Sequence, residues 1–215
     1  AARRNAELDH HHAAAVAERA ATLEKLKDAD PMSPARALEE IAGALPSQCI
    51  VVDESITTSL EVGGRLKYQQ PGDYYGARGG GIGQGIAGAL GVQIAHPDRP
   101  VLAVSGDGSA MYSIQSFWTA AHHQLPIVFV ILSNREYRVL KHNLDIYRQR
   151  FDVASNKPYP HMDLSSPGLD FAAMASGMGV RGELISEPEA IAPALKAAFA
   201  GRQPFVIEIV ISGKP

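Results

Sequence analysis

Residues 101–109 read Val101-Leu102-Ala103-Val104-Ser105-Gly106-Asp107-Gly108-Ser109, an apolar run that meets an acidic residue between two glycines. We interpret the run as a buried strand that is followed by the start of a helix. In a parallel sheet this junction lies at the carboxyl end of a strand, where doubly wound folds bind their ligands. The glycines let the backbone approach an anion, and the free N–H groups of a helix start can hold phosphate oxygens.

Asp107 itself would repel phosphate, so its position indicates a hard cation that bridges carboxylate and phosphate, as Mg²⁺ does. One crossover helix and one strand further on, the apolar run 127–132 ends at Ser133 and Asn134. Both junctions are then expected at the carboxyl ends of neighbouring parallel strands, where Asp107 and Asn134 can share a metal. A backbone carbonyl just beyond Asn134 would complete the protein's share of the ligands.

The rest of the chain alternates between apolar runs and helical stretches. Continuous apolar strands separated by helices predict an α/β doubly wound fold, with a mainly parallel sheet and helices on both faces. Strands are predicted at 49–52, 101–104, 127–132 and 205–211, with weaker ones near Val180 and within 68–77. Helices are predicted at 55–63, 82–95, 110–123, 171–178 and 188–200.

We divide the chain at residue 30. Residues 6–27 are rich in helix formers and contain neither Pro nor Gly, which predicts a helical lead-in or interdomain linker within 1–30. Ser33 followed by Pro34 predicts a capped helix start, so residues 31–215 are expected to form the ligand-binding domain. The stretch 144–168 contains three prolines and shows no apolar period, so we expect it to be irregular.

The composition excludes several classes of protein. The 215 residues carry 20 Lys and Arg against 23 Asp and Glu, so no basic field is present for nucleic acid or an anionic membrane. No apolar stretch approaches the ~20 residues that a bilayer span needs. The single cysteine, Cys49, cannot form an internal disulfide, and together these features predict a cytoplasmic protein.

A second glycine pattern suggests a different cofactor. Residues 83–88 match G-x-G-x-x-G, which is typical of dinucleotide-binding oxidoreductases. That motif requires an apolar strand immediately before it, whereas residues 72–79 are polar and rich in glycine. We therefore expect a glycine loop that passes close to a bound ring, and we keep a dinucleotide-binding oxidoreductase domain as an alternative.

Together, the motifs resemble the cofactor-binding domain of thiamine-diphosphate enzymes in the superfamily of benzoylformate decarboxylase, pyruvate decarboxylase and acetohydroxyacid synthase. Gly106-Asp107-Gly108, a helix, a strand and Asn134 are similar to the metal and diphosphate motif of that superfamily. The resemblance runs from about residue 31 to residue 215 and is strongest to benzoylformate decarboxylase. It is carried by residues 53–58, 80–83, 106–114 and 118–121.

The resemblance assigns roles to individual residues. It implies that Asp107, Asn134 and the backbone carbonyl of Glu136 hold Mg²⁺, and that Ile82 holds thiamine diphosphate in its bent conformation. The residues implied to contact the cofactor are Ile56, Thr57, Gly80, Gly81, Ile82, Gly106, Asp107, Gly108, Ser109, Asn134, Glu136 and Tyr137.

An activity and partners are implied as well. The activity is that of a lyase, a 2-oxo acid decarboxylase; the alternatives are a carboligase of the acetohydroxyacid synthase type and a non-catalytic cofactor-binding module. Superfamily members are homodimers or homotetramers with a pyrimidine-binding and a central domain ahead of this one. A glutamate of the pyrimidine-binding domain activates the cofactor. This chain is therefore expected to be an incomplete fragment; if it were active by itself, Glu54 or His161 would be candidates for a substitute.

The motif after the apolar run 127–132 departs from the superfamily pattern. Two asparagines and a glycine are usual there, whereas this chain reads Ser133-Asn134-Arg135. Arg135 therefore replaces a glycine at a turn that is expected to need a positive φ.

The remaining candidates border this site or belong to the core. Val139, Leu140 and Asn143 are expected to line the substrate pocket, and His161 is a candidate proton carrier at its mouth. Three adjacent histidines at 10–12 point in different directions on a helix, which favours a solvated face. Phe117 and Trp118 are both expected in the core.

Overall fold

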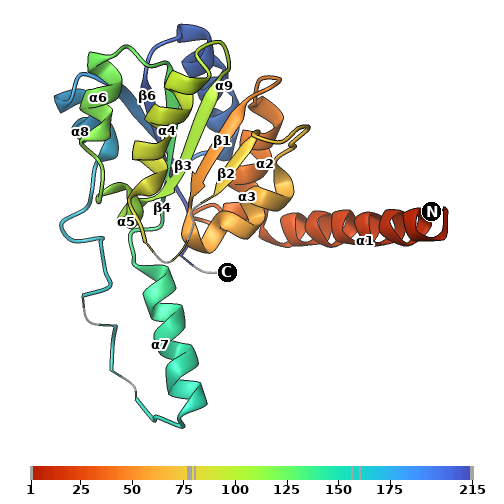
Figure 1. Ribbon diagram of the computed structural model, residues 1–215. Coiled ribbons are helices and arrows are strands. Elements are labelled where there is room, and N and C mark those ends of the chain that lie inside the picture. Colours follow the sequence, from red (N-terminus) through yellow and green to blue (C-terminus); the bar gives the residue numbers. More distant parts are fainter. Residues whose placement is uncertain (1, 77–78, 80, 156, 160, 214–215) are drawn as a thin grey trace.

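The computed structural model describes residues 2–76, 79, 81–155, 157–159 and 161–213. Within these residues six parallel strands form one sheet in the order β2-β1-β3-β4-β6-β5, with helices on both faces (Figure 1). The α/β doubly wound fold predicted from the sequence is confirmed. The strands are β1 (Ile50–Glu54), β2 (Tyr74–Gly76), β3 (Val101–Gly106), β4 (Ile127–Ser133), β5 (Arg181–Ile185) and β6 (Phe205–Val210).

Successive strand residues point to opposite faces of the sheet and form a separate hydrophobic core on each face, so helices have to cover both faces. Val51, Val104 and Val130 pack on one face against α2, α3 and α9. Ile50, Ala103 and Phe129 pack on the other face against α4, α6 and α8. The helices are α1 (Ala2–Leu26), α2 (Pro34–Ala44), α3 (Ser59–Arg65), α4 (Gln84–Ala95), α5 (Asp107–Ala110), α6 (Ser116–His122), α7 (Arg138–Arg150), α8 (Phe171–Gly177) and α9 (Pro188–Gly201), with a 3-10 turn η1 (Ile56–Thr58).

The helix starts expected near the amino terminus are present. Ser33 Oγ accepts a hydrogen bond from Arg36 N at 3.2 Å and Pro34 opens α2, as the capping pattern predicted. The lead-in forms the helix α1, which projects from the body of the domain (Figure 1). The Arg19 side chain of α1 donates to the Gly64 carbonyl of α3. The division of the chain at residue 30 stays a prediction.

Two predictions about local structure are wrong in part. The helix expected at 110–123 is interrupted, since α5 ends at Ala110 and α6 begins at Ser116. The stretch 144–168, expected to be irregular, begins inside α7, which runs to Arg150 and projects from the domain (Figure 1). None of the residues of α7 is buried, so this helix lies outside the core, and the three prolines further along the stretch concealed it.

The two aromatic residues of α6 have different environments. Phe117 is fully buried, as expected, and packs against Phe129. Trp118 is 56% exposed and stacks on His122, so its prediction as a core residue is wrong. None of the described helices is both long and apolar enough to cross a bilayer.

Candidate functional site

A cavity of about 770 Å³ opens at the carboxyl ends of β1, β3 and β4, a volume within the range of roughly 300–1,000 Å³ that is typical of small-molecule sites. Gly80, one of the predicted cofactor contacts, lies outside the described residues; the others all line this cavity. They are Ile56, Thr57, Gly81, Ile82, Gly106, Asp107, Gly108, Ser109, Asn134, Glu136 and Tyr137. Val139, Leu140, Asn143 and His161, expected at the substrate pocket, line it as well.

Strand register explains why residues distant in sequence meet here. Gly106, the last residue of β3, pairs with Leu132 near the end of β4. Asp107 and Asn134 therefore follow the ends of neighbouring parallel strands, as the spacing predicted. Glu54, the last residue of β1, pairs with Ser105 on the other side of β3. The turns that follow these three strands consequently share one edge of the sheet.

Asp107 joins two of these turns. Its Oδ1 accepts from Gly108 N at 2.7 Å, and its Oδ2 accepts from Arg135 N at 2.6 Å. Burial raises the pKa of the Asp107 carboxyl to about 6, against the lowering effect of these N–H donors. A cation beside Asp107 would offset the cost of burying its charge, which makes this carboxylate suited to a metal.

The loop after β4 is held from both sides. Arg135 has a φ of 57°, which confirms that this turn needs a positive φ even without glycine. Asn134 Oδ1 accepts from Glu136 N at 3.0 Å. Backbone hydrogen bonds from Leu164 N to Arg135 O at 2.8 Å and from Tyr137 N to Met162 O at 3.0 Å attach the loop to the returning segment. This attachment brings His161 to the cavity.

The oxygen donors of the cavity fit a hard cation. Among the described residues no three His, Cys, Asp or Glu side chains gather as a metal site, so a metal here depends on neutral ligands. Asp107, Asn134 and Glu136 all line the cavity, and they carry a carboxylate, an amide oxygen and a backbone carbonyl. Mg²⁺ binds to few protein carboxylates and takes its other ligands from water and phosphate.

Glu54 does not face the cavity. Its carboxylate is fully buried, with Oε1 accepting from Gln84 N at 3.1 Å and Oε2 from Gly85 N at 2.9 Å. Both oxygens are therefore committed to the first turn of α4, and Glu54 is not available as a substitute activating acid. The same contacts occupy the N–H groups that a dinucleotide pyrophosphate would need at residues 83–88, which removes the physical basis for that alternative.

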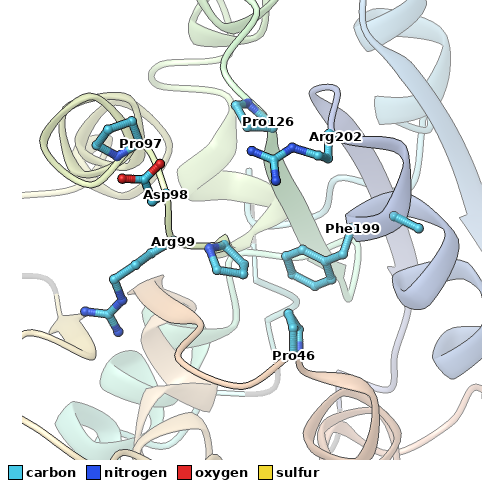
Figure 2. A pocket seen from close by; sticks show the side chains of 9 residues that line it. Pro46, Pro97, Asp98, Arg99, Pro126, Phe199 and Arg202 are labelled. Atoms are coloured by element: carbon cyan, nitrogen blue, oxygen red, sulfur yellow. The ribbon is translucent and has the colours of Figure 1, made fainter.

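A second hollow of about 300 Å³ lies at the opposite, amino edge of the sheet. Its labelled lining residues are Pro46, Pro97, Asp98, Arg99, Pro126, Phe199 and Arg202 (Figure 2). Arg99 is already engaged there, because it donates to the Gln48 carbonyl and to Asp73. None of the predicted site residues lines this hollow, so the candidate chemistry belongs to the carboxyl edge.

Four further residues of the carboxyl-edge cavity, Ser55, Gly79, Tyr112 and Arg138, were not predicted from the sequence. Ser55 lies within the motif 53–58, and its inclusion there was the available signal. Tyr112 comes from the interruption between α5 and α6, and the continuous helix expected there concealed it. Arg138 begins α7, and no motif marked it.

Comparison with known proteins agrees with this geometry. Residues 57–209 match the family described as "Thiamine pyrophosphate enzyme, C-terminal TPP binding domain". Benzoylformate decarboxylase of Pseudomonas aeruginosa is 36% identical over 183 residues, which cover 85% of this chain and 33% of that protein. The acetolactate synthase isozyme 2 large subunit of Escherichia coli is 26% identical over 81% of this chain and 30% of its own length.

A solved structure gives the same result. The thiamine diphosphate-dependent 4-hydroxybenzoylformate decarboxylase of Rhodococcus jostii RHA1 superposes with a TM-score of 0.75 at 34% identity. The match covers 85% of this chain and 33% of that one. This chain therefore spans about a third of the length of the relatives that it matches.

Proposed function

Since the chain belongs to the family of C-terminal thiamine-pyrophosphate-binding domains, we propose that its carboxyl-edge cavity binds the diphosphate of thiamine diphosphate through Mg²⁺, within a 2-oxo acid decarboxylase. One observation carries the proposal. Asp107 and Asn134 lie at adjacent strand ends, beside the glycine turn that begins with Gly106. A buried carboxylate beside an anion-binding turn is the arrangement that a bridging cation requires.

The lining residues can then be assigned to the metal and to the diphosphate. Asp107, Asn134 and the Glu136 carbonyl would hold the metal. Gly108, Ser109 and Thr57 would contact the diphosphate, because they line the cavity with small or hydroxyl-bearing groups. Bound thiamine diphosphate supplies the electron sink for cleavage of a carbon–carbon bond beside a carbonyl.

The apolar part of the lining faces the organic part of the ligand. Ile82 is 38% exposed at the cavity, although a large apolar side chain gains from burial. A bound cofactor ring would cover it, and the ring in turn would be held in one conformation. Val139 and Leu140 extend the apolar wall along α7 and would contact the substrate.

The whole protein is proposed to be a cytoplasmic homodimer or homotetramer with pyrimidine-binding and central domains beyond this chain. Relatives about three times as long support this proposal. A carboligase of the acetohydroxyacid synthase type is the second candidate function, and the Escherichia coli acetolactate synthase subunit supports it.

The test uses the full-length protein. We expect thiamine diphosphate with Mg²⁺ to raise the melting temperature and NAD to leave it unchanged, because ligands stabilise the state that binds them. Benzoylformate and pyruvate are then supplied separately and the products analysed. An aldehyde supports a decarboxylase, and a hydroxyketone supports a carboligase. Stabilisation by NAD alone would refute the proposal.

A further inference from the structure

Two consecutive buried carboxylates at the end of β1 point in opposite directions. Asp53 is 1% exposed and Glu54 is fully buried, yet neither lines the cavity. Buried carboxylates are costly unless they are hydrogen-bonded. Their partners therefore show what each one does.

Asp53 holds the turn on one side of the cavity. Its Oδ1 accepts from Ser55 N at 2.8 Å and from Ser55 Oγ at 2.7 Å, and its Oδ2 accepts from Tyr74 Oη at 2.8 Å. The next residue, Ile56, has a φ of 54°. A β-branched residue rarely adopts this conformation, so the surrounding contacts must hold it there. Thr57 follows directly and lines the cavity.

Glu54 holds a different part of the cavity lining. Its two oxygens accept from the N–H groups of Gln84 and Gly85, the first two residues of α4. A Cβ on Gly85 would lie 2.6 Å from Glu54 Cβ, so glycine is required for this close approach. The loop just before α4 carries Ile82, and Gln84 Nε2 closes that loop by donating to Gly81 O at 2.8 Å. Glu54 therefore fixes the start of α4, which follows Ile82 by two residues.

We propose that Asp53 and Glu54 are positioning residues that fix two segments of the cofactor cavity relative to each other. Asp53 holds Ile56 and Thr57 on the diphosphate side, and Glu54 holds the start of α4, two residues after Ile82, on the ring side. The inference rests on the proposed function, because it names what the two segments would contact. It assigns different consequences to two neighbouring carboxylates, which makes it testable.

The experiment compares Asp53→Asn and Glu54→Gln in the full-length protein. An amide has one acceptor oxygen, so Glu54→Gln turns an N–H donor toward a backbone N–H and loses one hydrogen bond. Asp53→Asn places its N–H toward the Tyr74 hydroxyl and removes the charge that strengthens the hydrogen bonds from Ser55 N and Oγ. In Asp53→Asn we expect the Kd of thiamine diphosphate with Mg²⁺ to rise about tenfold, the factor that 1.4 kcal/mol represents. Turnover of benzoylformate or pyruvate at saturating cofactor should stay within about threefold.

For Glu54→Gln we expect the opposite result, in which turnover changes more than the cofactor Kd. Turnover should fall about tenfold while the cofactor Kd changes by less than about threefold, because Glu54 is bonded to the start of α4 and not to Thr57, Gly108 or Ser109, the proposed diphosphate contacts. Hydrogen exchange of the apo protein gives a readout that needs no turnover. Glu54→Gln should speed exchange at Gln84 and Gly85, and Asp53→Asn should speed exchange at Ser55.

Asp73→Asn is the matched control. Asp73 is also buried and bonded, accepting from Gln69 N at 2.8 Å, Gln70 N at 3.0 Å and Arg99, but it does not line the cavity. Asp73→Asn should lower the stability of the protein without changing the cofactor Kd or the turnover selectively. If a charge-neutralising variant fails to fold, Tyr74→Phe removes one bond to Asp53, and Glu54→Asp is one methylene too short to reach both amides. Tyr74→Phe should then raise the cofactor Kd as Asp53→Asn does, but more weakly, and Glu54→Asp should lower turnover as Glu54→Gln does.

The outcomes separate the two claims. A wild-type protein that does not bind thiamine diphosphate refutes the proposed function. A wild-type protein that binds it, with both variants shifting Kd, exchange and turnover no differently from Asp73→Asn, refutes the positioning roles alone.

Discussion

Tyr137 lies so close to Gly108 that no side chain fits between them: a Cβ on Gly108 would be 2.7 Å from Tyr137 Cε1. Gly108 belongs to the turn after β3 and Tyr137 to the loop after β4, so the two turns touch through a glycine. We expect Gly108→Ala to displace the Tyr137 ring, to cost roughly 1–3 kcal/mol of stability, and to weaken cofactor binding. Calorimetric titration with thiamine diphosphate and Mg²⁺ and a denaturant melt measure both effects.

Gly88→Ala is the control for that substitution. Gly88 lies within α4, and a Cβ there meets nothing within 4 Å. Alanine should stabilise the helix by about 0.5–1 kcal/mol and leave cofactor binding unchanged. Equal effects of the two substitutions would show that the contact with Tyr137 is unimportant.

Asp107→Ala should lower the affinity for thiamine diphosphate in the presence of Mg²⁺ by roughly a hundredfold or more, because the charged metal ligand is lost. Asn134→Ala should lower it by roughly tenfold, since only a neutral ligand is lost. Titrations at several Mg²⁺ concentrations measure both. Asp170→Ala serves as the control, because it removes the carboxylate that caps α8 away from the cavity. Unchanged Mg²⁺ dependence in Asp107→Ala would overturn the metal assignment.

Much of the sheet could be predicted because a strand that is buried on both faces is a continuous run of apolar residues, which a short stretch of sequence shows. The apolar runs ending at Asp107 and Asn134 have to lie between two helical layers, so their composition alone identifies them. Spacing then placed both residues at one edge. The observed positive φ of Arg135 also followed from the glycine that is usual at that turn.

What could not be predicted depends on contacts outside a local window. The helix α7 contributes no buried residue to the core, and the prolines further along the same stretch concealed it. The interruption after Ala110 and the exposure of Trp118 are decided by how α6 packs against α4, which a single sequence window does not contain. The hydrogen bonds of Glu54 to α4 also join distant parts of the chain, because Gln84 and Gly85 follow Glu54 by 30 and 31 positions.

Ile82→Ala should reduce turnover about tenfold while changing the cofactor Kd by less than about threefold. The physical reason is that Ile82 would constrain the ring, whereas metal and phosphate contacts lie elsewhere. Steady-state kinetics at saturating thiamine diphosphate, together with a binding titration, separate the two quantities. Ile94→Ala is the control, since Ile94 is 64% exposed on α4 and does not line the cavity. Weak binding with normal turnover would reject the proposed role of Ile82.

Asp73 gives a prediction about acid stability. Hydrogen bonds from the Gln69 backbone and the Arg99 side chain lower the pKa of Asp73 from 3.8 to about 2. A lowered pKa means that the ionised form stabilises the folded state; this stabilisation is complete above pH 3.8 and is lost as the pH falls through about 2. Asp73→Asn should therefore lower the melting temperature at pH 7 and make little difference near pH 2. Equal destabilisation at both values would contradict the ionic role.

The last prediction concerns the 215-residue chain by itself: we expect it to bind thiamine diphosphate weakly and to convert no 2-oxo acid. Among the described residues, the acidic side chains lining the cavity are Asp107 and Glu136. Asp107 is proposed as a metal ligand, and Glu136 forms an ion pair with Lys141. With Glu54 bound to α4, none of these carboxylates is free to activate the cofactor.

Binding by this chain would rest mainly on phosphate and metal contacts, because Ile82 is 38% exposed within the described part of the chain and a ring placed against it would stay open to water. The measurement compares the cofactor Kd and the decarboxylation rate of this chain with those of the full-length protein, with benzoylformate and pyruvate as substrates. His161 is the remaining candidate for a substitute, since it lines the cavity. A rate near that of the full-length protein, abolished by His161→Ala, would mean that the chain is catalytically complete and that the second domain is not required.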